Sequence, residues 1–296
     1  MTRTRPEGDR TTGTPLGDPH LTASGSRPRP RSRSRYALAL GLIALPLLLA
    51  LLGPLFAGPP GPRSVSYATG GGHWLGTDFT GRDVWHQVLL GGRPVVLVAV
   101  AATLLAYAVA VPLGLTAALT RGGRLEEALM RPLDVLIAVP SLLLVLLVAA
   151  TLTPGPVGLT VLVGLAAVPD AARVVHAAAV EVSARPAVEA LRMQGESWWR
   201  TAFGYVARAL RRTLAADAGI RLTGALYLVS TAAFLGVGVQ PDAADWAVMV
   251  DRNRTGLFLQ PWGVVVPALL IAALSMGTNL LFDAALQRGG RRKGTT

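Results

Sequence analysis

Six ionisable side chains interrupt long apolar stretches of this 296-residue sequence or lie near their ends, and they are the first candidates for chemistry. Charged groups at membrane depth are energetically costly and commonly mark transport or proton pathways. We favour a functional role for Asp170, which directly follows Pro169, and expect solvated or paired structural roles for the others. The set is Asp170, Arg173, His176, Asp217, Arg221 and Asp283.

Patterns typical of a catalytic or metal centre are missing from the sequence. It has no cysteine, which excludes disulfides and thiolate chemistry, and its four histidines, at positions 20, 73, 86 and 176, are too scattered for a metal site. Neither a His-Glu-x-x-His pattern nor a Gly-x-x-x-x-Gly-Lys-Ser/Thr phosphate loop occurs. We therefore expect no catalytic residue, metal or cofactor, and a membrane-embedded enzyme fits poorly.

The composition is that of an all-α membrane protein. Hydrophobic residues make up 51% of the chain and charged residues 15%, against about 25% charged in soluble domains. A helix needs about 20 apolar residues to cross a bilayer, and the chain has room for about six such transmembrane helices. The expected spans are 36–57, 94–119, 133–152, 157–178, 214–238 and 262–286, and prolines within them predict kinks rather than breaks.

Four further segments complete the expected organisation. Residues 1–35 are rich in Arg and Pro and predict a disordered tail, 58–93 form a loop after the first span, and 287–296 are basic. Residues 94–286 are expected to form the main transmembrane domain. It contains a long loop at 181–212.

Basic residues are distributed unevenly, and this sets the expected orientation. The net charge is +11, yet all but five of the 28 basic residues fall in segments that share one side if there are six spans. Such segments are normally cytoplasmic, so both termini are expected in the cytoplasm. Nucleic acid is not an expected partner, because the Arg-rich tail adjoins a span and more plausibly orients it or touches anionic lipid.

The long inner loop has the pattern of a short amphipathic helix. Pro186 suits a first helical turn, Gly195 can end the helix in the left-handed conformation, and Ser197 can cap a second helix. Such a helix between two spans is suited to docking in a groove of a soluble partner. The alternative is a helix that lies on lipid headgroups. The small apolar stripe comprises Ala187, Val188, Ala190 and Leu191.

A turn-rich motif stands in the first outer loop. Arg82 can pair with a neighbouring carboxylate, so the motif is read either as a structural turn before the second span or as a substrate contact. Asp242, Asp245 and Trp246, after the fifth span, can meet an extracellular partner or cap the segment at the interface. The outer-loop motif comprises Gly76, Thr77, Asp78, Gly81, Arg82 and Asp83.

Four segments in the same order resemble the bacterial ABC importer permeases, specifically the second, C-type subunit of the dipeptide/oligopeptide/nickel class. Glu189-Ala190-Leu191 followed by Gly195 is similar to the loop that couples these permeases to their ATPase. The others are Leu75–Asp83, Arg131–Ser141, and Phe234–Pro241 followed by Trp246. The resemblance covers about residues 75–285. Leu191 replaces the second Ala of the family loop, and Ala207-Arg208 replace a family Leu-Pro, which puts the bend before the fifth span in doubt.

The resemblance implies a type I ABC importer permease fold in the bacterial plasma membrane, with a cytoplasmic coupling helix. Expected partners are cytoplasmic ABC ATPase subunits that bind the ATP, a second permease subunit in a heterodimer, an extracytoplasmic solute-binding protein, and lipid. The coupling residues would be Ala187, Val188, Glu189, Ala190, Leu191 and Gly195. Peptides, nickel and related small solutes remain open as cargo, and an ion-gradient-driven secondary transporter is the alternative.

Overall fold

The computed structural model describes residues 31–120, 123–240 and 242–291, with side chains described from residue 37 to residue 282 within these ranges. These residues belong to one compact unit, Ser32–Thr296, apart from Arg31. Most of the tail predicted at 1–35 and half of the basic segment predicted at 287–296 lie outside the described residues, and so does the side chain of Asp283.

The described residues form helices and irregular connections, with no strand among them. The prediction of an all-α protein is therefore confirmed. The helices are α1 Arg31–Phe56, α2 Val84–Leu119, α3 Gly123–Ile137, α4 Ser141–Leu152, α5 Pro156–Ser183, α6 Pro186–Met193, α7 Ala207–Phe234, α8 Trp246–Asn253 and α9 Trp262–Arg291, with a π-helix η1 Arg200–Val206 and a 3₁₀ turn η2 Arg254–Gly256.

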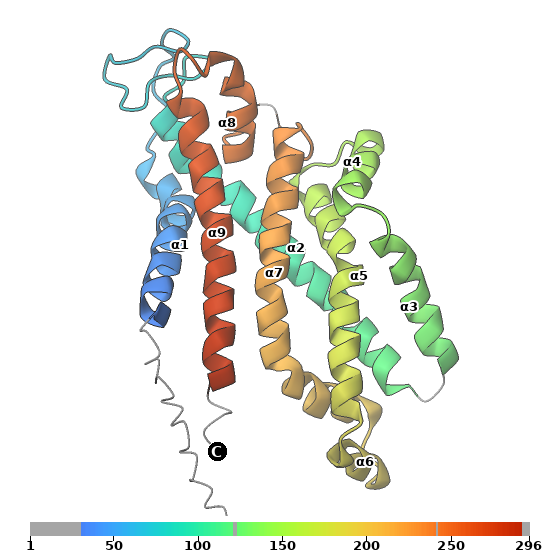
Figure 1. The fold of residues 1–296 in the computed structure, drawn as a ribbon. Coiled ribbons are helices and arrows are strands. Elements are labelled where there is room, and N and C mark those ends of the chain that lie inside the picture. The colour runs from blue at the N-terminus through green and yellow to red at the C-terminus, as the bar shows by residue number, and fades with distance from the viewer. Residues whose placement is uncertain (1–30, 121–122, 241, 292–296) are drawn as a thin grey trace, which may run out of the picture. The chain divides into compact units, whose positions relative to one another are not determined.

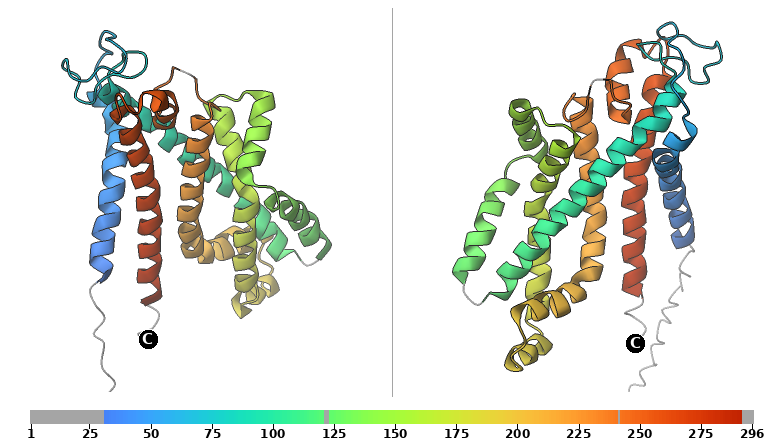
Figure 2. Two further views of the ribbon diagram at one scale, coloured as in Figure 1. Left: turned by 45° about the horizontal axis from the view of Figure 1, so that its top comes forward. Right: turned by 180° about the vertical axis from the view of Figure 1, so that it is seen from behind.

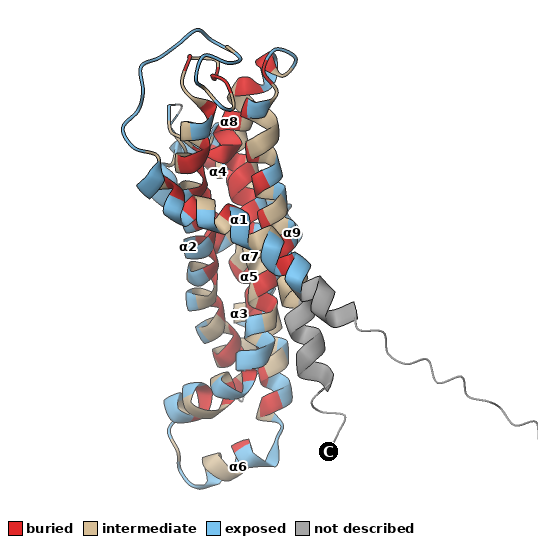
Figure 3. Ribbon diagram, turned by 90° about the vertical axis from the view of Figure 1, so that its left-hand side faces the viewer, coloured by how far each residue is buried: buried red, intermediate tan, exposed pale blue. Residues whose placement is uncertain are grey.

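The long helices run between two ends that carry different short elements (Figure 1). Helix α8 and the loop 57–83 lie at one end and α6 lies at the other, as both further views confirm (Figure 2). Helix α2 packs most extensively against α5, and α7 packs against both α5 and α9. Buried residues line the facing sides of these helices, whereas the outward sides are exposed (Figure 3).

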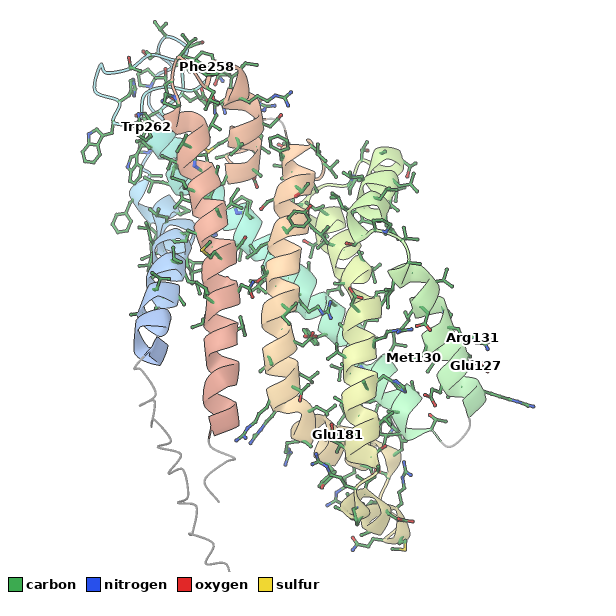
Figure 4. The ribbon with its side chains drawn as sticks, viewed as in Figure 1. Glu127, Met130, Arg131, Glu181, Phe258 and Trp262 are labelled. Atoms are coloured by element: carbon green, nitrogen blue, oxygen red, sulfur yellow. The ribbon has the colours of Figure 1, made fainter. Side chains whose placement is uncertain are left out.

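Large apolar side chains cover the outward sides of the long helices. Leu104, Leu147 and Leu269 are each more than 60% exposed. Such extensive apolar exposure is a hallmark of a surface that faces lipid or another subunit rather than water. Phe258 and Trp262 project at the α8 end, where aromatic side chains commonly mark a membrane interface (Figure 4).

By length and composition, four helices can cross a membrane: Ala37–Phe56 within α1, α2, α5, and Trp262–Phe282 within α9. Helices α3 and α4 add a fifth crossing if the bent pair is one span. The predicted span 214–238 lies largely in α7, which extends between the same two ends but carries Asp217 and Arg221 among other charges. A sixth crossing therefore remains a prediction.

The third predicted span, 133–152, is not continuous. Helices α3 and α4 meet at an angle of 86° around Pro140, so the prediction of a mere kink at this proline is wrong. Proline lacks an N–H and disfavours helical geometry at the preceding residue, here Val139. Pro140 instead precedes Ser141 as the N-cap of α4. At Pro46, Pro112, Pro169 and Pro267 the helices do continue, as predicted.

The second span begins ten residues earlier than predicted, at Val84 rather than residue 94. Asp83 caps the helix by accepting a hydrogen bond from the His86 N–H at 3.0 Å. Gly91 and Gly92 lie within this helix, and the Trp246 side chain packs against both of them. A Cβ on Gly91 would stand 2.9 Å from the indole, and one on Gly92 would clash with it. A local sequence pattern assigns these two glycines to a loop, whereas close packing against Trp246 requires them within the helix.

Trp246 is completely buried, and its indole N–H donates to the Val88 carbonyl oxygen at 2.8 Å. We predict that Trp246→Ala lowers the free energy of unfolding by about 3 to 5 kcal/mol, because a large cavity opens beside two glycines. Thermal denaturation of the detergent-solubilised protein, followed by circular dichroism, measures the loss. The matched control is Trp74→Ala, since Trp74 is 87% exposed. Equal effects of the two substitutions would contradict the packing described here.

Candidate functional site

The predicted short helix in the long loop is present as α6, and its ends have the expected geometry. Pro186 occupies the first turn. Gly195 has a φ of +75°, and the Glu196 N–H donates to the Leu191 carbonyl oxygen at 3.1 Å while the Gly195 N–H donates to that of Arg192 at 3.1 Å. This pair of bonds is the Schellman arrangement, which requires a left-handed residue and so favours glycine.

One side of α6 is anchored to the long helices. The Val188 side chain is fully buried in a cluster with Leu115 of α2, Val175 of α5 and Leu210 of α7. Arg192 donates from Nη2 to the carbonyl oxygen of Leu119, the last residue of α2, at 3.2 Å. A cation at a helix C-terminus is favourable, because the final carbonyls have no partner within the helix. Helix α6 is therefore bonded to the end of α2 and shares a buried cluster with residues of all three long helices.

Burial corrects the expected role of Val188, because a side chain fully enclosed by its own chain cannot also touch a separate protein. Ala190 and Leu191 are half-buried, and Ala187, Glu189, Met193 and Gly195 are exposed. We call these last four residues the α6 face. The apolar stripe predicted for docking is therefore divided: Val188 holds the helix, and the α6 face remains available. The sequence analysis missed Met193, which is 79% exposed.

A groove of about 440 Å³ adjoins α6, between Leu191 and the π-helix residues Arg200 and Tyr205. Ser197 caps the second helix as predicted, since its Oγ accepts from the Arg200 N–H at 3.4 Å. The aromatic rings of Trp199 and Phe203 stack with centroids 5.7 Å apart on this segment. An exposed, partly apolar surface thus extends from α6 onto the following helix.

The chain changes direction where it passes from η1 to α7 (Figure 2), although the helix continues without a break through Val206 and Ala207. The sequence put this bend in doubt because Ala207-Arg208 replace the family Leu-Pro. Here a π-helical segment, Arg200–Val206, takes the position before α7. Such wider turns are uncommon and alter the course of a helix without proline. No local sequence pattern predicts this π-helix.

The outer-loop motif is a hydrogen-bonded turn. Asp78 is buried, and its Oδ1 accepts from the N–H groups of Thr80 and Arg82, both at 2.8 Å, and from the Thr80 hydroxyl at 2.7 Å. Thr77 donates from its hydroxyl to the Val65 carbonyl oxygen at 2.6 Å. Gly76 has a φ of +72° and Gly81 one of +77°. These bonds support the structural-turn interpretation of Gly76, Thr77, Asp78 and Gly81.

The motif also joins segments that are distant in sequence. The carboxylate of Asp83, which caps α2, lies 2.7 Å from His73 Nδ1. This contact is a hydrogen bond, and it is also an ion pair when the imidazole is protonated. The Arg82 guanidinium lies 3.6 Å from the carboxylate of Asp242, and that of Arg252 lies 3.5 Å from it. Asp242 is exposed, so these ion pairs add little stability and orient the loop before α8.

Asp245 and Trp246 do not form an outer docking surface. Asp245 is 1% exposed and Trp246 fully buried. Asp245 Oδ1 accepts from the N–H groups of Ala247 at 2.9 Å and Val248 at 3.3 Å, so the carboxylate caps α8. The capping alternative from the sequence is therefore right for Asp245, whereas Trp246 packs inside the protein. Burial raises the pKa of Asp245 to about 6, although the two N–H bonds act in the opposite direction.

A charged network joins the middle of three long helices. Arg221 of α7 lies between two carboxylates, 3.2 Å from Asp217 and 3.3 Å from Asp170 of α5. Tyr107 of α2 donates its hydroxyl hydrogen to Asp217 at 2.5 Å. Arg173 of α5 donates from Nε to Asp134 of α3 at 2.8 Å. Sequence reasoning found Asp170, Arg173, Asp217 and Arg221 but missed Tyr107 and Asp134, since their pairing crosses between helices.

Comparison with known proteins gives consistent results. A sequence model of a family described as "Binding-protein-dependent transport system inner membrane component" matches residues 110–290. The chain is 28% identical to a probable D,D-dipeptide transport system permease protein of Escherichia coli, over 71% of this chain and 70% of that protein. It is 32% identical to a putative peptide permease protein of Brucella abortus, over 69% and 68% respectively. It is also 28% identical to an oligopeptide transport system permease protein of Bacillus subtilis, over 71% and 69%.

The buried carboxylate of Asp245 predicts a pH-dependent stability. Because its pKa rises from 3.8 to about 6, the folded protein binds the proton more tightly than the unfolded chain. The resulting cost is absent below pH 3.8, grows as the pH rises, and is complete above pH 6. We expect it to reach about 3 kcal/mol at most, at about 1.4 kcal/mol per pH unit.

Asp245→Asn keeps an oxygen that can cap α8 and removes the charge. The thermal midpoint of the variant, minus that of the natural protein, should therefore increase between pH 4 and pH 6.5. Differential scanning fluorimetry in detergent measures both. The exposed Asp242→Asn is the control, for which a constant difference is expected. If the difference for Asp245→Asn is also constant, the carboxylate is not held at a raised pKa.

Proposed function

This chain belongs to the family of binding-protein-dependent transport system inner membrane components, and on that premise we propose that it serves an ATP-driven importer of peptides as one of two permease subunits. Its relatives from three bacteria are named as permeases for dipeptides, peptides and oligopeptides. These names favour peptides over nickel as the transported solute. The role of the chain is transport, and ATP would be bound and hydrolysed by separate subunits.

The observation that carries this proposal is the placement of α6. The helix lies at one end of the long helices, keeps the α6 face exposed, and is held from within by Val188. Since Val188 shares one buried cluster with residues of α2, α5 and α7, a displacement of α6 would act on those helices together rather than on one of them. Transmission of this kind suits rigid-body switching between two arrangements of packed helices.

The remaining partners follow from the same proposal. Cytoplasmic ABC ATPase subunits would bind the α6 face and the adjoining groove. A second permease subunit would cover part of the exposed apolar surface, and lipid would cover the rest. An extracytoplasmic solute-binding protein would dock at the α8 end. An interfacial role for α6 on lipid headgroups is less favourable, because the α6 face includes Glu189, which anionic lipid would repel.

The proposed orientation places the α6 end in the cytoplasm, together with both termini. The loop around α6 carries Arg185, Arg192, Arg200 and Arg208. At the α8 end, Arg82 and Arg252 are paired with Asp242, and Arg254 lies 3.1 Å from Asp251. Around α6, Arg185 and Arg200 are paired in the same way, 3.8 Å from Glu181 and 3.2 Å from Glu196. The positive-inside rule counts basic residues rather than net charge, so the larger number of arginines around α6 supports this assignment.

A matched pair of substitutions at Gly195 tests the coupling role. Aspartate and asparagine both tolerate a positive φ and have nearly the same shape, and no atom lies within 4 Å of a Cβ built there. We predict that Gly195→Asp reduces ATP-driven uptake about tenfold or more, since a charge at the docking surface would disrupt binding by about 1.4 kcal/mol or more. Gly195→Asn should retain most of the activity.

The measurement is uptake of a radiolabelled dipeptide into proteoliposomes that contain the whole transporter, together with co-purification of the ATPase subunits. Equal uptake by the two variants would remove the α6 face from the mechanism. Uptake that proceeds without any ATPase, driven by an ion gradient alone, would establish the secondary-transporter alternative instead.

Reporter fusions test the orientation. We predict that alkaline phosphatase is active when fused after Thr77 and inactive when fused after Gly195, because the enzyme matures only outside the cytoplasm. A cytoplasmically active reporter, β-galactosidase, fused at the same two positions should give the reverse pattern. If both reporters reverse, the α6 end lies outside and cannot meet a cytoplasmic ATPase.

A further inference from the structure

A pocket of about 380 Å³ opens between the bent pair α3–α4 and the middle of α5. Its walls are mostly apolar and include Ile137, Leu144, Val148 and Leu165. Ser141 and Asp170 are the polar side chains of the lining, and Asp170 is the ionisable one. The volume falls within the range of small-molecule sites, about 300 to 1,000 Å³, in which few polar groups orient a ligand.

The charge around this pocket is unbalanced. Arg221 is shared by two carboxylates, those of Asp170 and Asp217, and Tyr107 donates only a neutral hydroxyl to Asp217. The four groups therefore carry one more negative charge than positive. The nearby Arg173, on the same helix as Asp170, is engaged by Asp134 of α3. His176, further along α5, faces Glu126 at 3.1 Å and adds no free cation.

The surplus charge lies at the pocket rather than inside the bundle. The side chain of Asp217 is 8% exposed and that of Asp170 is 52% exposed. Asp217 is also contacted by both Tyr107 and Arg221, whereas the described side-chain partner of Asp170 is Arg221 alone, at 3.3 Å. A carboxylate in an apolar pocket whose one ion-pair partner is shared with a second carboxylate is incompletely compensated, and a cationic ligand would complete it.

We propose that this pocket binds the amino-terminal residue of a peptide in transit, with the α-ammonium group at Asp170 and the apolar side chain against Leu144, Val148 and Leu165. The inference rests on the proposed peptide transport and adds a site within the membrane domain. Asp170 is the fifteenth of the 28 residues of α5, near the middle of that span. A site at this depth suits alternating access, since it can face either side of the membrane.

The absence of cysteine from the chain allows a direct test of the pocket. Ser141→Cys introduces one thiol into the lining with little change of volume. The complete transporter in native membranes is then treated with a cationic trimethylammonium methanethiosulfonate and, separately, with an anionic sulfonate methanethiosulfonate. We expect the cationic reagent to react at least about fivefold faster, once its intrinsically different rate with a free thiol is divided out.

Three further variants assign this preference to Asp170. Asp170→Asn should reduce the preference at least about fivefold, while Asp170→Glu, which keeps the charge, should retain it. Asp251→Asn is the matched control, because it removes a carboxylate from α8, at the end of the helices. L-Alanyl-L-leucine should slow the labelling, and N-acetyl-L-alanyl-L-leucine, which has no ammonium group, should not.

Several outcomes would overturn the inference. Equal labelling by the two reagents, or equal protection by the two peptides, means that no cation is recognised. Labelling of the isolated chain but not of the complete transporter means that the second permease subunit fills the pocket. Failure of the proposed function is a separate outcome. If the complete transporter imports no peptide but the pocket still prefers the cationic reagent, the proposed function is refuted and the cationic site remains.

Discussion

The need to pair every backbone polar group and every charge within the protein controls this structure, because an apolar surrounding offers no hydrogen bonds. Helices satisfy the backbone locally, which explains why long spans such as α2 and α5 dominate the described residues. The exceptions are informative. The chain leaves helical geometry within the α3–α4 pair only at residues 138–140, a break that ends at Pro140, which has no N–H to satisfy. The charges within the bundle are likewise joined into networks.

Close approach of helices depends on small residues at the contacts. Gly91 and Gly92 allow the Trp246 ring to lie against α2, and Gly114 of α2 lies against Val175 of α5, where a Cβ would stand 2.7 Å from the valine side chain. Van der Waals contact at short range is a main source of helix association in membranes, where apolar burial contributes little. The same close packing holds α6 in place, because Val188 is buried in one cluster with residues of three long helices.

The two ends of the molecule are built for different purposes. At the α8 end, buried polar residues such as Asp78 and Asp245 use their hydrogen-bonding atoms in turns and helix caps, so these atoms are not available to bind a partner. At the α6 end, exposed side chains surround a helix that is anchored from within. Under the proposed function, the α6 end receives the force of ATP binding, and the network around Arg221 lies between the two ends, where the solute would pass.

Composition and motif order were sufficient to establish an all-α membrane protein, the family, the short helix at Pro186–Met193 and its ending at Gly195. These features depend on local chemistry: apolar length, missing charges, and a glycine where φ must be positive. Tertiary structure alone decided that Val188 faces inward, that α2 begins at Val84, and that the span broken at Pro140 encloses a pocket beside Asp170. Each of these depends on which residues of distant segments come into contact, such as Trp246 with Gly92, and a one-dimensional pattern does not contain that information.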